Sequence, residues 1–376
     1  MTASKFSSGS NLFTDCFVSL KDPRRTTKGH ILYPINEILF LTISAVVSGL
    51  SSWTGIALFG EEKIEWLRSY FPYSNGSPSH DVLGNFFSLL DPAAFEACFA
   101  RWVSSIGSVG EGDIVCFDGK TIRGASRMEG RKYPIHVVSA YAANQRLCLG
   151  PLAVDQKSNE ITAIPKLLDQ LAIQGCIVTI DAMGCQKEIA HKIASKGADY
   201  ILMVKNNQQE LKEQVEKVLN RGNAAHSATD TDFGHGRIET RKCTVTQDVT
   251  FLDGKEEWSK MRSVIKVESE RIIKKAGEIS AETRYYISTL QADPKRLNAS
   301  IRSHWAIENN LHWSLDVIFG EDDQLKRKGY SAQNFNIINK VALGLLEQEK
   351  TCKGSKPNKR IKAALSDAYR VTVLKC

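Results

Sequence analysis

The run Asp113-Ile-Val-Cys-Phe-Asp-Gly-Lys120 is a short apolar segment that delivers one carboxylate, Asp118, onto a glycine. A β-branched run that ends in Asp-Gly is typical of a strand leading into a turn. The last side chain of such a strand lies at an exposed edge of the sheet, where a carboxylate can hold a metal ion. We therefore expect a strand over residues 114–118 and a candidate metal ligand at Asp118.

The residues that follow alternate between strand and helix patterns and supply a second carboxylate, Asp181. Strands are predicted over 136–142, 147–154, 176–181 and 200–205, and helices over 161–173 and 186–196. Three antiparallel strands followed by alternating helices and parallel strands predict an α/β fold, a mixed sheet with flanking helices. In such a sheet the first and fourth strands can be neighbours, which would place Asp118 and Asp181 within reach of one ion.

A third carboxylate, Glu308, lies in a helix predicted over 295–315. Before this helix, charged and β-branched segments predict an inserted β domain. The start of the chain has helical patterns over 34–47, 53–71 and 92–106, and a further helix that Ser79 is expected to cap. A helix-turn-helix reader of DNA within this helical region is a hypothesis only. The expected domains are an N-terminal helical, candidate DNA-binding domain (1–110), the first part of the α/β core (111–206), a β insertion (207–292), the third-carboxylate helix with the end of the core (293–350) and a basic C-terminal tail (351–376).

The composition excludes several classes of protein. Of 376 residues, 42% are hydrophobic and 24% are charged, as in ordinary soluble proteins, and the longest apolar stretch, 38–50, is shorter than the roughly 20 residues of a membrane span. The chain does not open with a signal-peptide pattern, so we expect a cytoplasmic location and no membrane contact. Nine scattered cysteines without a Cys-x-x-Cys pair favour reduced thiols over a disulfide framework or a zinc knuckle.

The positive charge is concentrated at the C-terminal end. Residues 324–376 contain 12 Lys and Arg against 3 Asp and Glu, a net +9, so the rest of the chain carries −2 of the total +7. A basic segment that includes Lys326-Arg-Lys328 and residues 353–362 is suited to a polyanion such as nucleic acid. The simpler interpretation is a solvated, frayed tail.

Asp118, Asp181 and Glu308 together are suited to divalent-metal chemistry. Mg²⁺ prefers oxygen ligands and keeps open positions for water, and two ions about 4 Å apart can assist both the attacking and the leaving oxygen of a phosphoryl transfer. Softer ligands would favour other metals. Taken singly, an Asp at a strand end is more often a turn former, and a Glu in a helix is usually a surface residue.

Several long sequence motifs, in a fixed order, resemble those of a known family. They are Asp22-Pro-Arg-Arg, Ser77-Pro-Ser-His-Asp, Asp118-Gly-Lys-Thr-Ile-Arg-Gly, Thr179-Ile-Asp-Ala-Met-Gly-Cys-Gln, Lys205-Asn-Asn-Gln, His235-Gly-Arg-Ile-Glu-Thr-Arg, Tyr285-Tyr-Ile-Ser and His304-Trp-Ala-Ile-Glu-Asn-Asn-Leu-His-Trp-Ser-Leu-Asp-Val. Together they resemble the H-repeat-associated branch of bacterial insertion-sequence DDE transposases, and the likeness covers nearly the whole chain.

The resemblance implies a ribonuclease-H-like catalytic core with the β domain inserted between the second and third acidic residues. Asp118, Asp181 and Glu308 would be the catalytic, metal-binding triad for two Mg²⁺ ions, with Mn²⁺ able to substitute. The enzyme would nick the end of its element and join the freed 3′ hydroxyl to target DNA. The expected partners are double-stranded DNA at the element ends and the target, and further copies of the chain in a homodimer or higher multimer, bound to the nucleoid.

The helix of the third carboxylate departs from the wider group of insertion-sequence transposases. That group places Tyr, Arg, Glu and Lys at fixed spacing, whereas here the Arg position falls on His304 and the Lys position on Leu315. Neighbouring polar residues are therefore candidates for DNA contact rather than assignments. These candidates are Lys120, Arg123, Arg237, Arg302, His304, Asn309, His312, Lys326, Arg327 and Lys328.

Two alternatives remain open from the sequence. His304, Glu308 and His312 recur every four residues, so on one helix face they could ligate zinc as in a metallohydrolase. Against this, eight residues of helix span about 12 Å, too far for all three to reach one ion. The other alternative is a transposase that has lost catalysis and serves as a DNA-binding protein.

Overall fold

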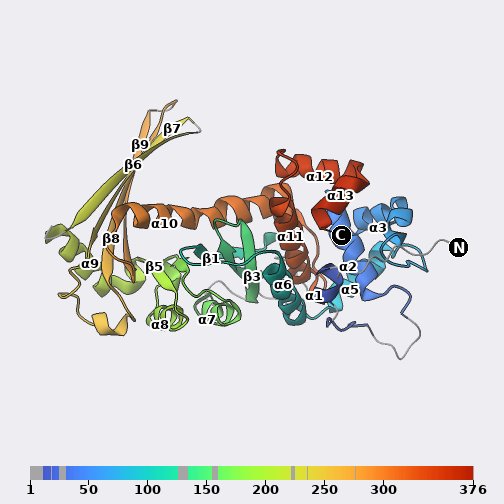
Figure 1. The fold of residues 1–376 in the computed structure, drawn as a ribbon, viewed down its shortest axis with the longest axis horizontal. Coiled ribbons are helices and arrows are strands. Elements are labelled where there is room, and N and C mark those ends of the chain that lie inside the picture. Colours follow the sequence, from blue (N-terminus) through green and yellow to red (C-terminus); the bar gives the residue numbers. More distant parts are fainter. Residues whose placement is uncertain are drawn as a thin grey trace.

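The structure is a computed structural model that describes residues 12–17, 19–24, 31–125, 134–154, 160–221, 225–234, 236–275 and 277–375. Arg25 and His235, which belong to two of the sequence motifs quoted above, lie outside these ranges. Within them a nine-stranded mixed sheet has the order β3-β2-β1-β4-β5-β9-β8-β7-β6. Helices cover the sheet, and a group of N-terminal and C-terminal helices lies at one end of the elongated molecule (Figure 1). The predicted mixed α/β architecture is therefore confirmed.

The first five strands form the half of the sheet that carries the aspartates. They are β1 (Ile114–Thr121), β2 (His136–Ala142), β3 (Leu147–Val154), β4 (Ile177–Ile180) and β5 (Asp199–Val204). β1, β2 and β3 pair antiparallel, whereas β1–β4 and β4–β5 are parallel. The expected adjacency of the first and fourth strands is confirmed by a register that runs from Ile114 opposite Ile177 to Phe117 opposite Ile180.

The strands of the predicted β insertion continue this sheet. β9 (Glu278–Ser288) pairs antiparallel with β5, and β8 (Ser263–Ile273), β7 (Arg237–Thr246) and β6 (His226–Gly234) follow outward. Their far ends project beyond the rest of the sheet (Figure 1). The sequence did not predict β6, because it has no alternating apolar face and is exposed or half-buried along its whole length.

Helices pack on both faces of the sheet. α7 (Glu160–Gln170) contacts β2 and β3 and α8 (Lys187–Ser195) contacts β5, while α10 (Pro294–Ala306) crosses the other face against β1, β4, β6 and β7 (Figure 1). α9 (Gln209–Arg221) packs against β7, β8 and β9. No helix in the described ranges combines the length and the apolar character that a bilayer crossing needs.

The N-terminal helices form largely as predicted. They are α1 (Leu12–Phe17), α2 (Ile35–Val47), α3 (Trp53–Glu62), α4 (Ile64–Arg68), α5 (His80–Leu89) and α6 (Pro92–Ile106). Ser79 caps α5 as expected, by accepting a hydrogen bond from the backbone N–H of Val82. The single helix expected over 53–71 is instead interrupted at Lys63, whose backbone leaves the helical region (φ −111°, ψ 19°).

The basic C-terminal segment is folded rather than frayed. After the buried helix α11 (Ser331–Gln348) it forms α12 (Lys356–Leu365) and α13 (Asp367–Leu374). Three of its cations are buried because backbone carbonyls satisfy them: Lys359 donates to Leu346 O (2.9 Å), Arg360 to Val46 O (3.1 Å) and Arg370 to Ala363 O (2.8 Å). These side chains hold helices together and are not displayed to a polyanion.

Candidate active site

The three predicted carboxylates come from two neighbouring strands and from the turn after α10. Phe117 of β1 and Ile180 of β4 are the last paired residues of the parallel ladder, so Asp118 and Asp181, one residue further along, leave the ladder at the same edge. Glu308 lies in a π-helical turn (Ile307–His312) that continues α10, and this turn packs against β1. The structure therefore brings all three predicted residues to one region.

Electrostatics show that the three carboxylates interact. Burial, and after it the negative charges of Asp181 and Glu308, raise the pKa of Asp118 to about 7, although the Gly119 N–H donates to its carboxylate (2.9 Å). Burial and the charge of Asp181 also raise the pKa of Glu308, against the opposing effect of Arg284. Mutual repulsion of this kind disfavours ionisation of the group, and a cation placed between the carboxylates would relieve it.

The donor set fits a hard divalent cation in its chemistry. All three groups are carboxylates, the ligands that Mg²⁺ prefers, and the pKa values of Asp118 and Glu308 are raised. As placed, no three Asp, Glu, His or Cys side chains of the described ranges lie close enough together to hold an ion. His312 stands beside the set, with Nδ1 3.5 Å from Asp118 Oδ2 and with Nε2 buried and without a hydrogen-bond partner.

The two histidines of the zinc alternative face different strands. His304 Nδ1 lies 3.0 Å from Thr179 Oγ1 on β4, whereas His312 lies against Asp118 on β1. Burial lowers the pKa of His304 to about 4 and that of His312 to about 3, so both rings are neutral. The turn that contains Glu308 also departs from the regular α-helix on which the four-residue spacing was based, because it closes i→i+5, as in the Trp313 N–H to Glu308 O bond.

Lys120, predicted as a phosphate contact, is occupied within the protein. Its Nζ lies 2.7 Å from Asp316, 3.0 Å from Glu321 and 3.3 Å from Asp322. Although burial opposes the shift, the charge of Glu321 and hydrogen bonds to Asp316 and Glu321 raise the pKa of Lys120. Asn336 in turn donates to the buried Glu321 carboxylate (2.7 Å). Lys120 thus ties β1 to the segment that follows the third carboxylate.

The other cations predicted from the basic segment make contacts of their own. Lys326 is buried over the rings of Trp53 and Phe335 and donates to Ser51 O (2.6 Å), and burial lowers its pKa to about 7. Arg327 donates to Gly124 O (3.4 Å). Lys328, which is exposed, donates to Asn85 Oδ1 (2.6 Å).

The remaining predicted contacts are exposed to different degrees. Arg302 pairs with Asp230 (3.3 Å) and Asp232 of β6, and Arg237 lies 3.9 Å from Glu239. Arg123 is 82% exposed although it approaches Asp322, and Asn309 is exposed beside Glu308. Of the predicted DNA contacts, Asn309 is thus exposed directly beside a residue of the triad, whereas Arg123 is exposed beside Asp322.

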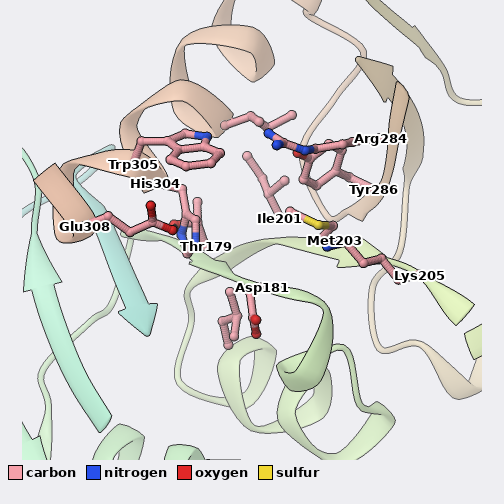
Figure 2. A pocket seen from close by; sticks show the side chains of 12 residues that line it. Thr179, Asp181, Ile201, Met203, Lys205, Arg284, Tyr286, His304, Trp305 and Glu308 are labelled. Atoms are coloured by element: carbon pink, nitrogen blue, oxygen red, sulfur yellow. Dashed lines mark hydrogen bonds between the residues drawn. The ribbon is translucent and has the colours of Figure 1, made fainter. Parts of the chain in front are cut away.

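A cavity of about 150 Å³ lined by Asp181 and Glu308 is also lined by two cationic side chains that the sequence analysis did not select, Lys205 and Arg284. In Figure 2 Glu308 lies to the left of the cavity, Arg284, Met203 and Lys205 lie toward the right, and Asp181 lies below, with its carboxylate pointing away from Glu308. The Arg284 guanidinium lies over the Trp305 ring (5.0 Å) and also pairs with Glu282 (2.7 Å). The sequence signal that could have identified Lys205 was its position directly after β5, the strand that pairs with β4.

A second cavity of about 380 Å³ continues from the first and shares Met203, Lys205 and Arg284 with it. Its lining extends to Asn206, Asn207 and Lys212, so basic and amide groups lead away from Asp181 and Glu308. Sequence reasoning could not find this path, because it depends on the pairing of β5 with β9 across more than seventy residues of chain.

Comparisons with known proteins identify the family of this chain. Residues 14–103 match the family model described as DDE_Tnp_1-associated, and residues 110–345 match the one described as Transposase DDE domain. The chain is 40% identical over 356 residues to "Putative transposase YncI" of Escherichia coli O157:H7, covering 92% of this chain and 90% of that protein.

Two proteins of Escherichia coli K12 are also similar to this chain. "H repeat-associated putative transposase YhhI" is 38% identical, covering 94% of this chain and 95% of its own. "H repeat-associated putative transposase YbfD" is 42% identical over 215 residues, covering 56% of this chain and 84% of its own. With a domain model over residues 110–345 and such relatives over most of its length, the chain belongs to the DDE transposase family, in its H-repeat-associated branch.

Proposed function

We propose that this protein cleaves DNA at the ends of an insertion sequence and joins those ends to target DNA, with Asp118, Asp181 and Glu308 as its catalytic triad. The observation that carries the proposal is the parallel β1–β4 register, which ends one residue before each aspartate, with Glu308 carried over the same two strands by α10. Family membership supports the same reaction.

The proposed core is ribonuclease-H-like. Three antiparallel strands, then two parallel strands joined through α7 and α8, support that architecture; of the first two acidic residues, Asp118 lies within the central strand β1 and Asp181 directly follows β4. The domain boundaries near 110, 206, 292 and 350 remain part of the proposal, and β6–β9 would be the insertion, joined to the core through the β5–β9 ladder.

The triad would hold two Mg²⁺ ions, with Mn²⁺ as a substitute, and these ions would supply activation of the attacking oxygen and stabilisation of the leaving one. The raised pKa values of Asp118 and Glu308 support this role, since a divalent cation offsets the repulsion between the groups. The chain's own neutral His304 would fix the Thr179 end of β4, and Arg284, braced on Trp305, would orient a phosphate beside Glu308.

The proposed DNA path follows the two joined cavities. Lys205, Arg284 and Lys212 supply three positive charges, and Glu282 within the same lining offsets one of them. Cationic side chains that follow the phosphate backbone position DNA without reading its sequence. Double-stranded DNA at the element end and at the target would be the partner, and two copies of the chain, or more, would hold paired ends.

The test is cleavage of a labelled duplex that carries the element's own end, in Mg²⁺, Mn²⁺, Zn²⁺ or EDTA. Wild type should nick the duplex only with Mg²⁺ or Mn²⁺, whereas Asp118→Asn and Glu308→Gln should bind it without nicking. Binding without cleavage by wild type would instead establish a DNA-binding protein that has lost catalysis. Cleavage only with Zn²⁺ would revive the metallohydrolase based on His304, Glu308 and His312.

A further inference from the structure

A buried histidine–carboxylate pair lies behind β1, on the opposite side of the strand from the Asp118 carboxylate. His136, the first residue of β2, approaches Glu160, the first residue of α7, with 2.5 Å between Nε2 and Oε1. Both side chains are almost fully buried, at 2% and 4% exposure. Burying a carboxylate and an imidazole together is costly unless both are well paired, so such a pair points to a specific role.

The imidazole of His136 is fixed at both nitrogens. Nδ1 lies 2.9 Å from Thr121 Oγ1, and Nε2 faces Glu160. Thr121 and His136 are directly opposite each other in the β1–β2 ladder, so their side chains share one face of the sheet. The arrangement Thr121–His136–Glu160 therefore anchors the start of α7 to the end of β1.

The His136–Glu160 pair lies close against the backbone of Gly119, the residue that follows Asp118. A Cβ added to Gly119 would lie less than 3.0 Å from His136 Nε2 and from Glu160 Oε1, so any side chain there would displace the pair. The backbone N–H of Gly119 in turn donates to Asp118 Oδ1 at 2.9 Å. The peptide group that holds the Asp118 carboxylate thus rests directly on the His136–Glu160 pair.

The charge of Glu160 also reaches Asp118. After burial, the negative charges of Asp181, Glu308 and Glu160 each raise the pKa of Asp118. Glu160 is therefore a fourth acidic residue in the electrostatic environment of the triad, although it does not line the cavity beside Asp181 and Glu308. The functional site described above does not otherwise use it.

We propose that Glu160, held by His136, is a positioning residue that fixes the Asp118–Gly119 peptide and adds a fourth negative charge for cation binding. This inference rests on the proposed metal-dependent function. Groups just outside a metal's ligand shell commonly set ligand orientation and change metal affinity when they are replaced. His136 keeps Glu160 in place and would not touch the metal or the DNA.

The test measures cation binding without DNA and without turnover. Free Mn²⁺ is titrated by electron paramagnetic resonance against folded wild type, Glu160→Gln, Glu160→Asp and Asp118→Asn. Glu160→Gln should weaken Mn²⁺ binding about tenfold, Glu160→Asp should restore much of the loss, and Asp118→Asn should weaken it at least as much. Glu349→Gln is the matched control, because Glu349 is a buried carboxylate whose partners are Thr351, Tyr369 and Lys359.

The outcomes separate this inference from the proposed function. Mn²⁺ affinity that is lost in Asp118→Asn but unchanged in Glu160→Gln would overturn the role of Glu160 and leave the triad standing. Wild type that binds Mn²⁺ no better than Asp118→Asn would overturn both. If Glu160→Gln does not fold, Thr121→Val removes only the hydroxyl that holds His136, and it should weaken Mn²⁺ binding several-fold. Unchanged affinity in that variant would equally refute the inference.

Discussion

Asp118→Asn should stabilise the metal-free protein while it abolishes cleavage. In the native state the pKa of Asp118 is raised from 3.8 to about 7, first by burial and then by neighbouring negative charges. Its side chain is 19% exposed, so solvent screens the effect only in part. Three pKa units correspond to about 4 kcal/mol, and we expect asparagine at this position to recover about 2 to 4 kcal/mol at about pH 8.

The sign follows from proton binding. The unfolded chain loses the Asp118 proton near pH 4, whereas the native protein keeps it until about pH 7, so the native state binds more protons between these values. Wild-type stability should therefore fall as pH rises through this window and then level off above it. The gain from Asp118→Asn should be close to zero at about pH 4 and full at about pH 8.

The assay is urea denaturation in EDTA across this pH range. Asp113→Asn is the matched control at the other end of β1: although burial opposes the shift, hydrogen bonds from Gly110, Asn144 and Gln145 lower the pKa of Asp113. Its replacement should destabilise the protein at neutral pH, with the difference shrinking in acid. An Asp118→Asn variant that is less stable than wild type at about pH 8, or equally stabilised at about pH 4, would refute the electrostatic reasoning.

Three further predictions address the cations. Lys205→Ala combined with Lys212→Ala should weaken DNA binding in EDTA and lower the dependence of the binding constant on salt concentration by about one to two in log–log slope. Lys217→Ala is the control, because Lys217 lies on α9 but outside both cavities, and it should change neither quantity. Fluorescence anisotropy measures both. Lys120→Met should cost about 3 to 5 kcal/mol of stability, because three carboxylates lose their shared partner, and an unchanged urea midpoint would contradict the contacts described. Arg370→Met should release α13 from the Trp66 ring and expose new sites to limited proteolysis; an unaltered cleavage pattern would argue against that packing.

The strand that contains Asp118 and the one that precedes Asp181 were predictable because each is a short β-branched run. Their adjacency followed from the usual pairing of strands in an α/β sheet, and the structure has it. The expected turn at Gly119 was wrong, because β1 stays paired with β2 as far as Thr121. β6 escaped prediction because both of its faces meet solvent or polar groups, which removes the period-two signal.

The positions of cations were much less predictable. Lys120 and Lys326 occur in sequence motifs that suggest phosphate binding. Each is buried by partners that lie far away along the chain, among them Glu321 for Lys120 and Ser51 for Lys326. Lys205 and Arg284 meet only because β5 pairs with β9. Charge can be counted in a sequence, but the partner of a charge is a property of the tertiary fold.

The docking of the C-terminal helices also has a consequence for synthesis. Arg360 binds the end of α2 through Val46 O, Lys63 pairs with Asp367, and Arg370 lies on the Trp66 ring. The first helices to emerge from the ribosome therefore cannot complete their packing until residues up to 370 have been translated. Contacts that span some three hundred residues close slowly, and the unfinished surface is open to aggregation meanwhile. A nascent chain of this protein should thus depend on chaperones until its last helices arrive, and a premature stop before residue 360 should expose apolar surface at the opposite end of the sequence.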